Sequence, residues 1–207
     1  MTRVMRSGTP GGRTNWRRFA AAAGLASVVA AGVLMLQANG TLAATFAVSG
    51  QQFKVSADSL DGTGFVNYGW IDQRADRTAV PVAVTAIRHA TLRNMCQSVL
   101  TSLPIVGDIS LKLTAGTGNT PVTADDLFID MAQLDANTDF SNIEIGRDAS
   151  TLNKGPASAQ GLQGLFGQQA DTVHITNLRQ VAWASNAGTF RLSGMRMTVI
   201  KGKDECF

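Results

Sequence analysis

The two histidines of the chain, His89 and His174, are its candidates for a general base. His174 stands between Val173 and Ile175 in an alternating apolar and polar segment, so we expect its ring on the solvent face of a strand. The sequence contains no G-x-S-x-G motif, which holds the nucleophilic serine of many hydrolases. We therefore interpret both histidines as surface or hydrogen-bonded residues, and we keep catalysis by one of them with an unidentified serine as the alternative.

Three side chains with oxygen donors, Asp135, Asn137 and Asp139, alternate along one short segment. This D-x-N-x-D spacing is that of the first ligands of a calcium loop. Phe140 occupies the position where such a loop needs glycine for its tight turn, and Gly146 occupies the position of the bidentate glutamate. We expect a solvated acidic turn here, with a calcium site as the alternative. Nothing in the sequence indicates a cofactor.

Cys96 and Cys206 are the only cysteines of the chain. Neither has a second cysteine or a histidine at the spacing of a metal-ligand pair. In an oxidising compartment a single pair is most simply one disulfide, which would close a loop of about 110 residues and contribute about 4 to 5 kcal/mol in the chain-entropy model. The alternative is two unpaired buried thiols.

The segments that must position these residues alternate with a period of two, which predicts an all-β domain. The clearest strand is 109–115, whereas 147–170 is expected to be a long loop and 96–107 an apolar loop or short helix. Similar short sequences, such as KVSADSL at 54–60 and PVTADDL at 121–127, are typical of stacked β-turns. We therefore predict an elongated folded sheet or a β-solenoid-like domain, with a β-sandwich or jelly roll as the alternative.

An uncharged apolar segment of 18 residues, Phe19–Leu36, follows a leader with five arginines and no acidic residue. Such an arrangement is an export or membrane signal. We expect one apolar helix within residues 1–44, either cleaved near residue 40 or 44 or retained as an anchor, and an extracytoplasmic domain over 45–207. The residues expected to contact lipid in this segment are Phe19, Leu25, Val28, Val29, Val33, Leu34 and Leu36.

The formal net charge of +3 comes from the leader, because the rest of the chain has 13 basic against 15 acidic side chains. These basic residues are spread singly, unlike the clustered footprint of a nucleic-acid-binding surface. The expected partners are therefore a membrane, through the N-terminal segment, and a lipid or an envelope protein, but not nucleic acid.

A Gly-rich sequence, GLQGLFG at 161–167, places Leu162, Leu165 and Phe166 in an otherwise polar loop. Exposed apolar loop residues can insert into membranes or bind a lipid chain, whereas isolated ones more often pack inward. These three residues are our candidates for lipid contact, with core packing as the alternative. The same two interpretations apply to a second apolar loop, which contains Leu103, Ile105 and Val106.

The run FAVSGQQFKVSADSLDGTGFVNYG at 46–69, directly after the leader, resembles an uncharacterised family of exported proteins from actinobacteria. The resemblance extends over nearly the whole chain, and 53–58 and 60–65 are its most specific part. Members of that family are often labelled cholesterol esterase. The resemblance implies a secreted or membrane-anchored protein, and it assigns no catalytic residue.

The leading hypothesis is an exported cell-envelope protein, extracellular or anchored to the outer face of the plasma membrane. Its role would be binding or structural rather than enzymatic, with lipids as one expected class of ligand. The alternative is a secreted lipid or cholesterol esterase that uses an unrecognised serine with His89 or His174.

Overall fold

The computed structural model describes residues 47–207, which belong to one compact unit, Thr45–Phe207. The expected apolar helix, with its anchor residues and both candidate cleavage sites, lies outside the described residues. Within residues 47–207, no helix is long and apolar enough to cross a bilayer. The all-β prediction is confirmed, because every described element except one short 3-10 turn is a strand.

The strands of the domain are joined by short connections, apart from the segment 152–165. The strands are β1 Ala47–Val48, β2 Phe53–Arg74, β3 Ala79–Arg93, β4 Met95–Leu103, β5 Gly107–Ala115, β6 Val122–Ser141, β7 Glu144–Asp148, β8 Phe166–Asn186, β9 Thr189–Arg191 and β10 Arg196–Lys201, and the 3-10 turn η1 spans Ala149–Thr151. The expected loop over 147–170 is therefore confirmed only in its middle. The loop or helix expected over 96–107 is wrong up to Leu103, because β4 pairs with β5 along its whole length.

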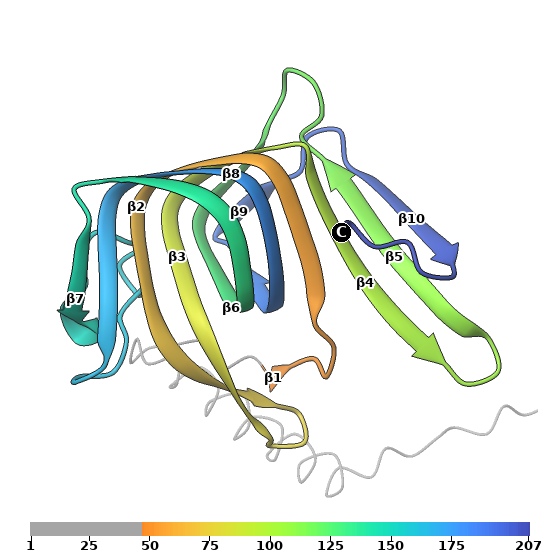
Figure 1. The fold of residues 1–207 in the computed structure, drawn as a ribbon, viewed down its shortest axis with the longest axis horizontal. Helices are drawn as coiled ribbons and strands as arrows, with labels where there is room; N and C mark the ends of the chain where they lie inside the picture. Colours follow the sequence, from red (N-terminus) through yellow and green to blue (C-terminus); the bar gives the residue numbers. More distant parts are fainter. Residues whose placement is uncertain (1–46) are drawn as a thin grey trace, which may run out of the picture. The chain divides into compact units, whose positions relative to one another are not determined.

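Four long strands form a closed cycle of antiparallel pairs. β2 pairs with β3 and with β8, and β6 pairs with both β3 and β8, so the sheet closes on itself. Figure 1 shows these four strands arching together, with β4, β5 and β10 extending to one side. Of the arrangements expected from the sequence, the folded sheet is the one observed.

The long strands bend where single residues have a left-handed backbone. Gly64, with φ of 70°, lies between the pairs Thr63–Thr172 and Phe65–Ala170 on β2 and β8. The residues of β2 that belong to the larger apolar cluster change parity across it, from Leu60 to Phe65, whereas Val66 belongs to a second cluster. A Cβ atom at Gly64 would lie 2.6 Å from the backbone oxygen of Lys154, so both the conformation and the space require glycine.

Two apolar clusters form the core. The larger one takes side chains from all four long strands, including Leu60, Ile87, Leu127 and Val173, and fills the space that the cycle encloses. The smaller one lies around Val66 and the valines of β3, where it is covered by Ala149, Leu152 and Ala159 from the turn η1 and the segment 152–165. The long loop is therefore a cover for one part of the sheet.

Substitution of Gly62 tests the packing inside the cycle. A Cβ atom at Gly62 would lie 2.8 Å from Ile87 Cγ2 and 2.9 Å from Val173 Cγ1, which belong to the strands on either side. We expect Gly62→Ala to lower the free energy of unfolding by about 1 to 3 kcal/mol, since overpacking forces neighbours to move. The measurement is urea denaturation.

The matched control is Gly69→Ala on the same strand, where a Cβ atom meets no other atom within 4 Å. This variant should be as stable as the wild type or slightly more stable, because alanine restricts the unfolded chain. Equal stability of Gly62→Ala and Gly69→Ala would show that the interior is not packed as described.

Candidate functional site

Each histidine forms a close pair with an aspartate from a neighbouring strand. His89 Nδ1 lies 2.7 Å from Asp125 Oδ1, and His174 Nδ1 lies 2.6 Å from Asp61 Oδ1. Because an ionised carboxylate only accepts, each ring donates from Nδ1, which orients its Nε2 away from the carboxylate. All four side chains are about half exposed. The expected solvent-facing position of His174 is confirmed.

Both histidines line one open depression of about 400 Å³ on the polar face of the sheet. Four hydroxyl groups also line it, those of Thr63, Thr91, Ser141 and Thr172. Among the hydrogen bonds of the described residues, none joins a serine or threonine hydroxyl to either imidazole ring. The depression therefore offers two oriented histidines and several hydroxyls, but no assembled nucleophile and base.

The three candidates for calcium binding lie on a strand. The turn expected over 135–139 is wrong, because β6 pairs with β8 through this stretch, whereas the expected exposure of these side chains to solvent is observed. Alternate residues of a strand are about 7 Å apart, so these side chains do not converge as those of a loop do. Asp135 and Asn137 line a second depression of about 500 Å³, whereas Asp139 lines the depression with the histidines. Within residues 47–207, no group of three or more His, Cys, Asp or Glu side chains is arranged to hold a metal ion.

Two carboxyl groups that the sequence does not associate, Asp72 on β2 and Asp130 on β6, interact at the edge of the smaller core. Burial, followed by the charge of Asp72, raises the pKa of Asp130 to about 7. Burial also raises the pKa of Asp72. Nearby, burial and then the charge of Asp130 raise the pKa of Tyr68 to about 12. Asp72 Oδ2 is buried and has no hydrogen-bond partner in the described chain, and burial favours the neutral form of both carboxyl groups.

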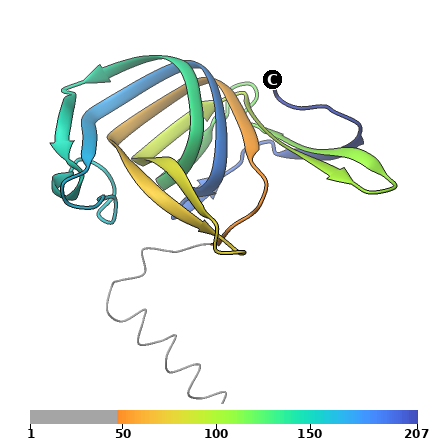
Figure 2. The ribbon, with the colours of Figure 1, turned by 60° about the horizontal axis from the view of Figure 1, so that its bottom comes forward.

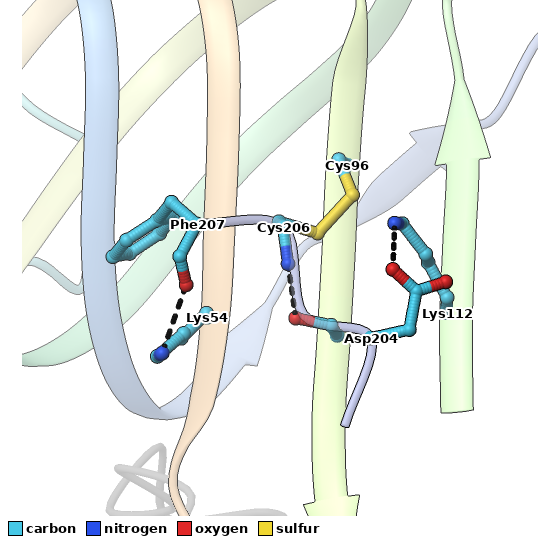
Figure 3. Close-up of a disulfide and its surroundings, with 7 residues drawn as sticks. Lys54, Cys96, Lys112, Asp204, Cys206 and Phe207 are labelled. Atoms are coloured by element: carbon cyan, nitrogen blue, oxygen red, sulfur yellow. Dashed lines mark hydrogen bonds and ion pairs between the residues drawn. A yellow bond between two sulfur atoms is a disulfide. The ribbon is translucent and has the colours of Figure 1, made fainter. Parts of the chain in front are cut away.

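The three strands β4, β5 and β10 form an arm, and the C-terminal tail, residues 202–207, covers one of its faces. Cys206 forms a disulfide with Cys96 on β4, with their Cα atoms 5.8 Å apart, so the disulfide prediction is confirmed. Figure 3 shows this bond between two further anchors, Lys112 Nζ to Asp204 Oδ1 at 2.8 Å and Lys54 Nζ to the backbone oxygen of Phe207 at 2.9 Å. The tail is therefore held to the arm at Cys96 and Lys112, and its last residue is held to β2 of the closed cycle.

The opposite face and the tip of the arm are apolar and exposed. Val199, on the edge strand β10, is 71% exposed beside its cross-strand partner Leu111. At the turn between β4 and β5, Leu103 is 42%, Ile105 107% and Val106 48% exposed. Core packing is therefore wrong for this loop.

The other candidates for lipid contact are also exposed. Leu162 and Leu165 lie in the covering segment, and Phe166 is the first residue of β8. The inward-packing alternative is therefore wrong for these three residues as well. Leu152 and Ala159 are the residues of this segment that pack against the smaller apolar cluster.

The raised pKa of Asp130 predicts a pH-dependent stability. Because the pKa of Asp130 is raised from 3.8 to about 7 on folding, its protonated form stabilises the fold below about pH 4, and this stability is lost as the pH rises through 7. We expect Asp130→Asn to be more stable than wild type at pH 8 by roughly 1 to 3 kcal/mol, discounted for partial exposure, with no advantage at pH 4. Denaturation at both pH values measures this.

The control for that substitution is Asp126→Asn, an exposed residue of the same strand. It should follow the pH profile of the wild type. If Asp130→Asn also runs parallel to the wild type from pH 4 to 8, folding does not raise the pKa of Asp130.

Removal of the disulfide tests how much the attachment of the C-terminal tail to the arm stabilises the fold. We expect Cys96→Ala combined with Cys206→Ala to lower the free energy of unfolding by about 4 kcal/mol, because the bond closes a loop with a sequence separation of 110 residues. Reductant should produce the same loss in the wild type and no change in the double variant. An unchanged denaturation midpoint of the wild type in reductant would contradict the assignment.

Comparison with known proteins finds one match. Residues 49–207, more than half of the chain, match a family of unknown function, DUF6230. No curated protein and no solved structure matches the chain. The match spans the closed cycle, the arm and the disulfide-bonded tail, and the chain therefore belongs to the DUF6230 family.

Proposed function

We propose that this chain is an exported protein of the cell envelope with a non-enzymatic binding or structural role. The observation that carries the proposal is a filled interior combined with an exposed apolar arm. Leu60, Ile87 and Leu127 inside the cycle are each at most 2% exposed, so side chains occupy the enclosed space. Binding by such a domain takes place on its outer surface rather than in a cavity.

The placement outside the cytoplasm is supported by two independent features. Residues 1–18 contain five arginines and no acidic residue, and an uncharged apolar segment follows them, which is the pattern of an export or membrane signal. The Cys96–Cys206 disulfide is of the kind that persists in oxidising compartments. Both features point to a location outside the cell or on the outer face of the plasma membrane.

The arm supports a binding role because it combines rigidity with exposed apolar surface. The disulfide and the ion pair between Lys112 and Asp204 fix the tail on one face. The other face has exposed apolar residues, Leu111, Met197 and Val199. Apolar surface that is exposed on a well-ordered element is typical of contacts with a partner or a membrane.

The second candidate function, a lipid or cholesterol esterase, is favoured by the depression with the two histidines. Both rings are oriented by aspartates, as the base of a catalytic triad is, and Ser141 lines the same surface. The resemblance to exported actinobacterial proteins labelled cholesterol esterase points the same way. A complete triad also needs a serine or threonine hydroxyl that is hydrogen-bonded to the imidazole ring. Bound substrate can shorten such a hydrogen bond.

Assays with short-chain and sterol esters distinguish the two functions. The purified full chain should hydrolyse none of these esters above the rate of buffer, and His89→Ala and His174→Ala should give the same rate as the wild type. Thr117→Ala, in the exposed loop before β6, serves as the matched surface variant. Turnover by the wild type that either histidine substitution abolishes, and Thr117→Ala preserves, would overturn the non-enzymatic role.

A further inference from the structure

The turn between β4 and β5 has a chemistry that is unusual for an exposed turn. Its sequence, Leu103-Pro104-Ile105-Val106, has no polar side chain. Ile105 has φ of 78°, a left-handed conformation that normally takes glycine or asparagine and that is strained for a β-branched residue. Ile105 is thus an exposed apolar residue at a position where the backbone favours glycine or asparagine and the solvent favours a polar side chain. Backbone strain of this kind is typical of functional sites.

The apolar surface of the tip continues along the arm. Val99 of β4 pairs with Leu111 of β5, which pairs with Val199 of β10. Leu103 has the same parity as Val99, so its side chain lies on the same face of the arm. The C-terminal tail occupies the other face, where Cys206 N donates to Ser98 Oγ at 3.0 Å. One face therefore offers apolar side chains from the tip along the arm.

Basic residues lie next to this tip. Lys201 ends β10 opposite Ile109, and Lys203 Nζ lies 3.8 Å from Asp108 Oδ2, at the first residues of β5. Asp108 also accepts a hydrogen bond from Ser102 Oγ at 2.5 Å, so its charge is partly satisfied within the turn. An apolar tip with lysines behind it complements an anionic lipid surface, whose interior takes the apolar side chains and whose headgroups attract the ammonium groups.

The chain reaches the domain beside the arm. Thr101 Oγ1, near the tip, donates to Gln51 Oε1 at 3.0 Å, so the segment before β2 contacts the arm. Figure 2 shows the arm projecting from the closed cycle.

We propose that the tip Leu103–Val106 inserts into the headgroup region of an anionic lipid bilayer, with Lys201 and Lys203 at the headgroups. This inference deepens the proposed function, since it rests on a location at the membrane and names the partner of the arm. The tip supplies a second contact besides the N-terminal segment and fixes the orientation of the domain on the membrane.

The test places a tryptophan at the tip of the full chain. Val106→Trp leaves the strained residue Ile105 unchanged, and the control Asn119→Trp lies in the exposed loop between β5 and β6. Each variant is reconstituted in vesicles of phosphatidylcholine and phosphatidylglycerol, with and without brominated acyl chains. The emission of the wild type, which holds three tryptophans, is subtracted.

The added emission of Val106→Trp should shift to shorter wavelength by roughly 10 nm and lose at least half its intensity in brominated lipid, because the tip is then in an apolar environment. The added emission of Asn119→Trp should be that of an indole in water and remain unquenched. If the tip indole of Val106→Trp also emits as in water in vesicle-bound protein, the tip does not insert. If its emission is shifted but brominated lipid does not quench it, a protein segment or a second copy covers the tip, and the proposal is wrong.

A second variant pair keeps the test independent of the folding of Val106→Trp. Ile105→Trp should give the same shift and quenching, and adding Lys201→Glu and Lys203→Glu to it should reduce the quenching at least twofold. Unchanged quenching would contradict the role of the lysines. Failure of insertion in protein that still fractionates with the envelope leaves the proposed function standing, whereas ester hydrolysis would overturn that function without affecting the tip.

Discussion

The covalent bond between Cys96 and Cys206 is the constraint on which the arrangement of the arm depends. The tail that it holds has little apolar surface of its own, and it satisfies two hydroxyls that are almost completely buried. Ser98 Oγ accepts from Cys206 N, and Ser110 Oγ donates to the backbone oxygen of Gly202 and accepts from Asp204 N. Without the tail these hydroxyls would lose their partners, and one face of the arm would change from interior to surface. The bond therefore decides which face of the arm is available to a partner.

The closed cycle and the arm both begin from strand β2, with which β3 of the cycle and β4 of the arm pair. β3 and β4 follow β2 in one register, from Ser59–Arg93 to Ser56–Cys96, and the interruption is Asn94, which has φ of 51°. Its side chain donates to Asp58 Oδ2 at 2.5 Å, so the bend is hydrogen-bonded rather than loose. After the bend β4 pairs with β2 as far as Ser98, and then it leaves β2 as the first strand of the arm. A single asparagine thus lies where the chain passes from the closed cycle to the arm.

The local sequence pattern was sufficient to predict the strands and their exposed faces. The features that depend on which strands pair with one another could not be predicted from it. Alternation predicted the all-β domain and the exposed face of His174, and the cysteine count predicted the disulfide. The segment at 96–107 was misinterpreted because Pro104 belongs to the turn that follows β4, rather than to a loop that begins at Cys96. The raised pKa of Asp130 beside Asp72 could not be predicted, because these residues meet only when β2, β3 and β6 are neighbours. The closure of the cycle has no local signal at all.

Residues 47–207 fold with a Cys96–Cys206 bond, and the central claim that we propose is that they do so on the outer side of the plasma membrane. The most direct measurement is mass spectrometry of peptides from the full chain, isolated from the envelope fraction and digested without reductant after the thiols are blocked. We predict one linked peptide that contains both cysteines and no blocked thiol at either position. Blocked thiols at both cysteines, or the intact chain in the cytosolic fraction, would contradict the claim.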